Sequence, residues 1–278
     1  MKNIVWMLFV LLAYGCTEET TVDNGRDNQS KIVGSIELKE LIPSDSYDVT
    51  STKTFMFSDG RISYYVSAQE VEGGKLFSSS DTTFVSASDQ SVRITDSYGN
   101  IRTYQLDTSG FAVSCRMEEG GGTERNYDFT YITDSEGHKY LSGVTEKTDN
   151  GDTYSSLRLD YSEEGKVRVE QTVDGSSETY IIEFNKSVAV ENTHGLPDLF
   201  LSELYPLSMH MVAFYGGFIG DTYRYLCTDM YPASSPELEE HTSYEYSLGD
   251  DGELSGCRMV TVSGGEEYVR NISVKLTI

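Results

Sequence analysis

Two short motifs in this 278-residue chain contain residue types that can hold metal ions. Met209-His210-Met211 places two thioethers beside an imidazole, a ligand set that suits copper(I). Successive side chains on a helix point in different directions, however, so we interpret this motif as core packing. Asp149-Asn150-Gly151-Asp152 has part of a calcium-binding loop but lacks its spaced acidic ligands and terminal glutamate. We therefore predict no metal site and no cofactor.

Adjacent acidic residues are the remaining candidates for catalysis. Glu118-Glu119, Glu163-Glu164 and Glu239-Glu240 could supply the two carboxylates of a glycosidase. Neighbouring residues of a strand face opposite sides of the sheet, and acidic pairs in turns are usually solvated. The four histidines are far apart in the sequence, and no nucleophile elbow, phosphate-binding loop or dinucleotide motif occurs. We predict no catalytic or cofactor-binding residues and expect that the protein is not an enzyme.

Cys16 is the residue for which the sequence indicates a specific modification. It follows a lysine, an apolar run over residues 4–13 and a small glycine, the features of a secretory signal. Cleavage before Cys16 would leave its thiol to carry the acyl chains that anchor the protein in a membrane. We predict residues 1–15 as a lipoprotein signal peptide, with an ordinary signal peptide or an uncleaved anchor as the alternatives. The expected location is the outer membrane, on the cell surface or the periplasmic face.

Residues 16–31 contain almost no apolar side chains, which predicts a flexible acidic tether before a single domain over residues 32–278. Glu18 and Glu19 resemble the export signal of surface-exposed lipoproteins, the alternative being a linker that is merely acidic. The chain has 45 acidic and 21 basic residues, a formal net charge of -24. Such a surface repels phosphate backbones, so we expect no nucleic acid among the partners.

The domain shows short apolar–polar alternations separated by turn residues, the pattern of an antiparallel sheet with one dry face. Tyr127, Phe129 and Tyr131, for example, are interleaved with polar residues, which places all three on one face. Turn signals such as Asp59-Gly60 recur roughly every 10 to 15 residues, which favours a meander of more than ten strands. We predict an all-β fold, either a large curled antiparallel meander sheet or a closed barrel.

One segment, Leu196–Gly220, breaks this alternation. Residues such as Leu199 and Leu207 have helical spacing, and Pro206 is expected to end or kink the first turns. An apolar helix in a sheet protein must bury its faces, and the dry face of the sheet is the available place. We predict a short helical segment near 197–215 that plugs or caps the sheet.

An internal repeat relates two distant parts of the domain. Tyr104–Glu124 aligns without gaps on Tyr246–Glu266 with eight identities, which include Cys115-Arg116-Met117 and Cys257-Arg258-Met259. A hairpin unit used twice explains the repeat, and its cysteines are then better suited to fill equivalent core positions than to form a bond. With Cys227, three cysteines follow Cys16, so at least one does not pair within the chain. The spacing leaves their pairing open.

The turns LDTSGF (106–111), LDYSEEGKV (159–167) and YSLGDDGEL (246–254), with a hydrophobic element that has Gly-Gly near its end, resemble those of a known family. It is an uncharacterised domain-of-unknown-function family with a porin-like fold, found in Gram-negative lipoproteins. The resemblance covers residues 32–278 and implies a curled antiparallel sheet or closed porin-like barrel. It brings no catalytic or binding residues. Because many apolar runs are short and rich in Ser, Thr and Tyr, we do not expect the strands to cross a membrane.

These features favour a lipid-anchored envelope protein that acts as a non-catalytic binding or interaction platform. The chain has 20 tyrosines, whose rings with polar tips suit a half-wet concave surface that contacts glycans or proteins. The alternative reading is that tyrosine is simply a good strand former. Two other functions stay open: a glycan-cleaving enzyme with two strand carboxylates, and a structural envelope component.

Overall fold

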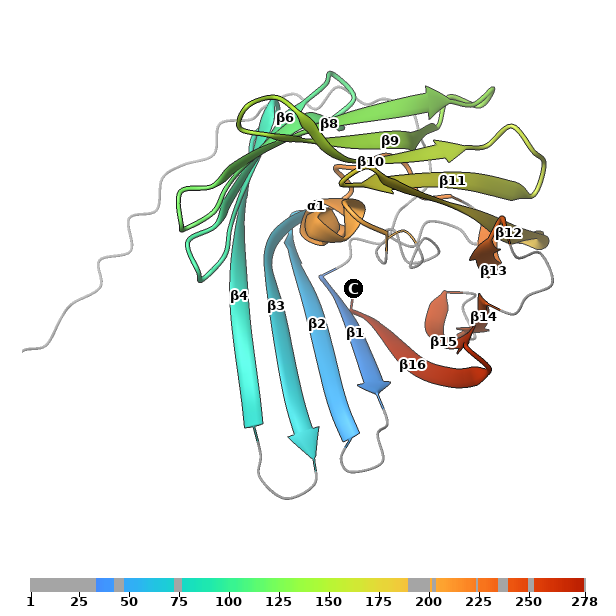
Figure 1. The fold of residues 1–278 in the computed structure, drawn as a ribbon. Helices are drawn as coiled ribbons and strands as arrows, with labels where there is room; N and C mark the ends of the chain where they lie inside the picture. The colour runs from blue at the N-terminus through green and yellow to red at the C-terminus, as the bar shows by residue number, and fades with distance from the viewer. Residues whose placement is uncertain are drawn as a thin grey trace, which may run out of the picture. The chain divides into compact units, whose positions relative to one another are not determined.

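The computed structural model describes residues 34–42, 48–72, 77–189, 201, 204–223, 225–234, 240–249 and 253–277, and their strands form a closed antiparallel barrel (Figure 1). Each strand pairs with its neighbours in sequence, and β1 closes on β16. The sixteen strands are β1 (Ser35–Ile42), β2 (Asp48–Ser58), β3 (Arg61–Glu72), β4 (Phe77–Ala87), β5 (Ser91–Thr95), β6 (Ile101–Leu106), β7 (Ala112–Glu118), β8 (Glu124–Thr133), β9 (Lys139–Thr148), β10 (Thr153–Asp160), β11 (Lys166–Val173), β12 (Ser176–Ala189), β13 (Tyr225–Pro232), β14 (His241–Leu248), β15 (Leu254–Ser263) and β16 (Glu266–Thr277). The predicted meander is confirmed, and the closed barrel is the correct form of it.

Tight hairpins make this strand order possible. In Asp59-Gly60, between β2 and β3, the φ angles are 53° and 73°, and in Asp174-Gly175, between β11 and β12, they are 47° and 79°. Two successive residues with positive φ are typical of turns whose twist matches that of the flanking strands. The ends of the meander then meet, with Leu38 of β1 opposite Val274 of β16.

The side chains alternate between the barrel interior and its outer wall. On β8, Tyr127 and Phe129 are buried, whereas Asp128 and Thr130, which alternate with them, are exposed. The same period holds on β10, where Leu157 and Leu159 are buried. The interior is therefore the hydrophobic core, as the sequence alternation predicts for a sheet with one dry face.

The described residues between β12 and β13 lie inside the barrel and pack against its core. Its helical turns are η2 (Leu207–His210), a 3-10 helix, and α1 (Met211–Tyr215), which lies inside the ring of strands in Figure 1. Leu204, Leu207 and Phe214 are buried in the same core as the strand side chains. We call residues 204–223 the plug.

The prediction of a short helical segment near 197–215 that packs on the sheet is confirmed. Within the predicted range 197–215, the helical turns η2 and α1 cover 207–215 and begin after Pro206. Proline lacks an N–H and has a fixed φ, so it is tolerated at the start of a helix better than inside one. Leu199 and the other residues of 190–200 lie outside the described part of the chain.

The internal repeat corresponds to two equivalent hairpins. Tyr104 faces Cys115 across β6 and β7, and Tyr246 faces Cys257 across β14 and β15. The strand register shifts at the equivalent point of each hairpin, directly before Leu106 in the first and directly before Leu248 in the second. Cys115 and Cys257 are both buried thiols, which confirms that they fill the core.

Neither helix among the described residues has the length and apolar composition needed to cross a lipid bilayer.

Candidate functional site

The most highly connected polar group inside the barrel is the carboxylate of Glu146 on β9, which has no exposed surface. Its Oε1 atom accepts hydrogen bonds from Arg125 Nη1 at 2.6 Å and from Tyr127 Oη at 3.3 Å. Its Oε2 atom accepts from Ser155 Oγ at 2.6 Å and from Tyr205 Oη at 2.6 Å. Both carboxylate oxygens are thus occupied, and one of the four donors comes from the plug.

The strand register brings three of these groups together. Glu146 lies directly opposite Tyr127 of β8 on one side and opposite Ser155 of β10 on the other. Arg125 precedes Tyr127 by two residues, so its side chain faces the same interior. Tyr205 is 59 residues further along the chain than Glu146 and reaches it only because the plug runs through the barrel.

The surroundings of Glu146 hold its partners in their donating forms. Burial, and then the charge of Glu146, raise the pKa of the Tyr127 hydroxyl. Burial and the hydrogen bond to Glu146 likewise raise the pKa of Tyr205, and the hydrogen bond to Glu146 raises the pKa of Arg125. A buried carboxylate with four donors is a structural latch, because leaving any of these groups unpaired would be costly. We call these five residues the Glu146 latch.

Glu146 was not among the predicted site residues, although the sequence around it contains a signal. Glu146 follows Val144 by two residues in an alternating run, so it shares the face of an apolar side chain. An acidic residue on a dry face needs a buried partner. The identity of that partner depends on the plug, which no local pattern reveals.

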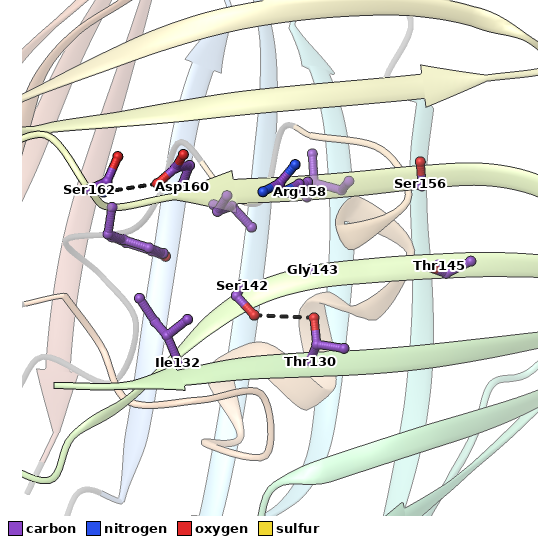
Figure 2. A pocket seen from close by; sticks show the side chains of 12 residues that line it. Thr130, Ile132, Ser142, Gly143, Thr145, Ser156, Arg158, Asp160 and Ser162 are labelled. Carbon is purple, nitrogen blue, oxygen red and sulfur yellow. Dashed lines mark hydrogen bonds between the residues drawn. The ribbon is translucent and has the colours of Figure 1, made fainter.

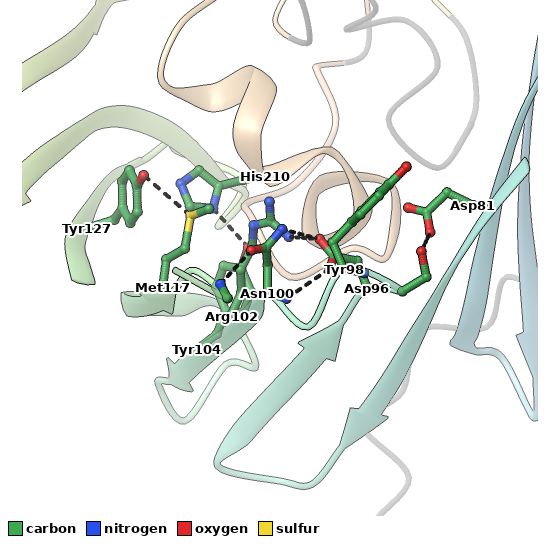
Figure 3. Close-up of polar contacts among 11 residues, drawn as sticks. Asp81, Asp96, Tyr98, Asn100, Arg102, Tyr104, Met117, Tyr127 and His210 are labelled. Carbon is green, nitrogen blue, oxygen red and sulfur yellow. Dashed lines mark hydrogen bonds and ion pairs between the residues drawn. The ribbon is translucent and has the colours of Figure 1, made fainter. Parts of the chain in front are cut away.

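His210 occupies the core beside the latch (Figure 3). Its Nδ1 atom lies 2.8 Å from the hydroxyl of Tyr104, and the rings of Tyr127 and Phe129 lie nearly perpendicular to it at 4.4 and 5.1 Å. Burial, helped by the positive charge of Arg102, lowers the pKa of His210 to about 3. The imidazole is therefore neutral, and the predicted core packing of Met209-His210-Met211 is confirmed.

The acidic pairs singled out in the sequence do not come together. Glu118 forms an outward ion pair with Arg116 at 3.4 Å, and Glu163 pairs with Lys166 at 3.8 Å. Glu240 is exposed, and Glu239 lies outside the described residues. These carboxylates are solvated surface charges, as expected for acidic pairs in turns and on outer strand faces.

The loop Asp149-Asn150-Gly151-Asp152, which has part of a calcium-binding motif, also lies on the surface. Residues 149–152 form the exposed turn between β9 and β10, closed by a backbone hydrogen bond from Thr148 N–H to the carbonyl of Asp152 at 2.9 Å. Within the described ranges, no three His, Cys, Asp or Glu side chains gather as metal ligands. The predicted lipidation site, Cys16, lies outside the described residues.

The described tyrosines fit the reading that tyrosine is a strand former better than the reading of a half-wet concave surface. Most described tyrosines are buried or pack against the core, because the barrel interior needs large side chains to fill it. Those with large exposed surfaces are Tyr64, Tyr98 and Tyr268. A binding surface built mainly from exposed tyrosines is therefore excluded for this part of the chain.

A groove of about 720 Å³ lies on the outer wall over β8, β9 and β10 (Figure 2). The pairing of β9 with β10 ends at Gly143 opposite Arg158, whereas β10 continues to Asp160, so the two strands separate there. Half of the lining residues carry hydroxyl groups, and one guanidinium and one carboxylate accompany them. The lining residues that Figure 2 labels are Thr130, Ile132, Ser142, Gly143, Thr145, Ser156, Arg158, Asp160 and Ser162.

Gly143 is required at the centre of this groove. A Cβ atom at this position would lie 2.9 Å from Thr130 Oγ1 and 3.1 Å from the carbonyl oxygen of Leu157. Both approaches are closer than ordinary van der Waals contact, so only glycine fits without a shift of its neighbours. A glycine inside a strand indicates a close backbone approach. Gly143 was therefore a sequence signal that could have pointed to the groove, although it was not among the predicted residues.

Outside the groove, the wall carries cross-strand ion pairs. Lys147 pairs with Asp128 at 2.6 Å between β9 and β8, and Arg258 pairs with Glu245 at 3.1 Å between β15 and β14. A membrane-embedded barrel has the reverse arrangement, with an apolar outer band and a polar interior.

These features define a class of protein: a closed antiparallel barrel with a plugged, largely apolar interior and a charged outer wall. Residues 55–255 match the family described as a domain of unknown function (DUF4595) with porin-like fold, and the chain belongs to that family. The predicted resemblance to this family is thus confirmed.

Two solved structures share the fold. A porin-like protein from Bacteroides uniformis is 35% identical, with a TM-score of 0.81, over 88% of this chain and 96% of that one. A porin-like protein from Bacteroides vulgatus has a TM-score of 0.54 and 13% identity over 87% of this chain and 97% of that one. No protein of curated function matches the chain.

Proposed function

We propose that this protein is a lipid-anchored envelope protein whose barrel is a non-catalytic binding module, with the outer groove at Gly143 as its ligand site. The observation that carries the proposal is the distribution of polarity in the barrel: an apolar core packs around the plug inside, and cross-strand ion pairs such as Lys147–Asp128 and Arg258–Glu245 lie on the outer wall. A charged wall disfavours insertion into lipid, and a filled interior disfavours conduction. The acylated Cys16 would then provide the attachment to the membrane.

The chemistry of the groove favours a glycan as its ligand. Its volume of about 720 Å³ falls in the range of small-molecule sites. Ser156, Ser142 and Thr130 offer hydroxyl groups that both donate and accept hydrogen bonds. Arg158 and Asp160 add a charged donor and a charged acceptor, so the lining can pair with a ligand that carries many hydroxyl groups.

A thermal-shift screen of the detergent-solubilised protein against a glycan panel tests this site. A ligand at about 100 times its Kd adds about 2.7 kcal/mol to the stability, which raises Tm by several degrees. Ser156→Trp fills the groove and should abolish the rise, whereas Ser273→Trp, on the outer wall of β16, should preserve it. No response across the panel, or an equal response of both variants, would refute the glycan site.

The same screen addresses catalysis. Incubation with each glycan, followed by an assay for reducing ends, distinguishes a binding module from a glycan-cleaving enzyme. We expect no release, because Glu118 and Glu163 are held in separate surface ion pairs. If reducing ends are released and Ser156→Trp abolishes this release, the protein is an enzyme that acts at the same groove and is not a binding module.

A further inference from the structure

The outer face of β2, β3 and β4 differs from the charged wall described above. Nine outward side chains form three rows across these strands, and none of them is charged; we call this array the neutral face. The rows are Thr52–Ala68–Ser80, Thr54–Val66–Thr82 and Met56–Tyr64–Phe84.

Charged residues border the neutral face on both sides. On β1, Glu37 and Lys39 lie opposite Thr54 and Thr52, and on β5, Arg93 lies opposite Ser86 of β4. Along the strands, the neutral face ends at the next row, Thr50–Glu70–Ser78, where Glu70 is charged and exposed. The neutral face is thus an uncharged area on a chain with a formal net charge of -24. This part of the outer wall can be taken out of water without burying an ionised group.

The third row gives the neutral face an apolar edge. Phe84 is 63% exposed and Tyr64 is 37% exposed, and they are direct neighbours across β3 and β4. Met56 continues the row onto β2. Single exposed apolar residues are ordinary on protein surfaces, but a contiguous row that includes two aromatic rings is typical of a contact surface.

The tether joins the barrel next to this row. Ser35 pairs with Met56, and the carbonyl of Gly34 accepts a hydrogen bond from Phe57 N–H at 2.9 Å. Eighteen residue steps separate Cys16 from Gly34, a covalent reach of at most ~60 Å. An acyl chain on Cys16 would therefore hold lipid within reach of the strand edge on which the row begins.

We propose that the anchored barrel rests with its neutral face against the lipid, with the Met56–Tyr64–Phe84 row at the level of the headgroups. This inference depends on the proposed acylation of Cys16. Aromatic side chains are enriched at membrane interfaces, and the hydroxyl groups of Thr54 and Thr82 suit the polar headgroup region. The acidic remainder of the surface is repelled by anionic lipid, which leaves the neutral face as the side that approaches.

Tryptophan fluorescence can test this orientation with little background. The one tryptophan of the chain, Trp6, lies in the predicted signal peptide, so a mature protein would contain none. Phe84→Trp and Tyr64→Trp each place a probe in the apolar row. Leu248→Trp is the matched control, since Leu248 is 43% exposed but lies on β14, four strands from β2.

Each variant, acylated at Cys16 and without residues 1–15, would be reconstituted into phosphatidylcholine vesicles with brominated acyl chains, and the parent protein in the same form serves as the blank. Flotation first shows whether the protein is attached, and unchanged Tm values show that the variants fold. We expect about a twofold loss of fluorescence for Phe84→Trp and Tyr64→Trp, relative to unbrominated vesicles, and little loss for Leu248→Trp.

The outcomes separate the two proposals. Flotation without quenching of either row probe, or with equal quenching of Leu248→Trp, would overturn the orientation while leaving the lipid anchor intact, and would favour a protein partner for the neutral face. Failure of the acylated parent protein to float would overturn both the anchor and the orientation.

Discussion

At the scale of single residues, the Glu146 latch ties the plug to the barrel wall. Glu146→Ala leaves four donors without their acceptor and should reduce the free energy of unfolding by about 3 kcal/mol. This value is at the low end of the cost of breaking a buried ion pair, because Arg125 is partly exposed. Tyr205→Phe removes one bond to a charged group and should cost about 1.5–3 kcal/mol. Chemical denaturation measures both. The control is Tyr268→Phe, which removes a surface hydrogen bond from the Tyr268 hydroxyl to Glu266. If Tyr205→Phe and Tyr268→Phe lower the free energy of unfolding by the same amount, the latch is contradicted.

His210 predicts a specific dependence of stability on pH. Its pKa falls from 6.5 to about 3 on folding, so below pH 6.5 the unfolded chain binds a proton that the folded barrel does not. The stability contributed by neutral His210 is complete above pH 6.5 and is lost as the pH falls toward 3, by up to about 1.4 kcal/mol per pH unit.

Urea denaturation between pH 7 and pH 5 checks this prediction, because carboxylates of ordinary pKa stay ionised there. His210→Gln keeps an acceptor for the Tyr104 hydroxyl but cannot titrate, so its stability should vary less over this interval. An undiminished slope in His210→Gln would show that another group causes the loss.

At the scale of elements, Gly143 allows β8, β9 and β10 to approach each other beneath the groove. Gly143→Ala forces a Cβ against Thr130 and the Leu157 carbonyl and should destabilise the barrel by about 1–3 kcal/mol, the usual cost of overpacking. Gly121→Ala is the control, because nothing lies within 4 Å of an added Cβ there. Thermal unfolding compares them, and equal Tm values would show that the strands can separate to accept a side chain.

Local patterns predicted the elements well where one face of a strand is dry. Tyr127 and Phe129 are buried as their alternation indicated, and the repeated hairpins match down to the register shifts before Leu106 and Leu248. The helical spacing near 197–215 identified the segment that packs against the core, and its described turns η2 and α1 directly follow Pro206. Propensity and spacing are local, whereas the plug is shaped by the interior that it fills.

At the scale of the whole molecule, closure of the barrel could not be derived from the residues alone. Pairs such as Leu38 with Val274 join the two ends of the domain, and alternation fixes which face of each strand is dry without fixing its distant partner. The Glu146 latch depends on the plug through Tyr205, and the outer groove depends on where β9 and β10 stop pairing. The sequence therefore indicated that known catalytic motifs are absent, but it did not give the positions of the Glu146 latch and the outer groove.

The central claim is that the barrel is held at the membrane by lipid and does not span it. The most direct test is fractionation of cells that express Cys16→Ala alongside the parent protein, with a protease-resistance assay to confirm that the barrel is folded. We expect the parent protein to stay with the membranes and Cys16→Ala to move to the aqueous fraction as a folded barrel. A folded Cys16→Ala barrel that stays in washed membranes would contradict it.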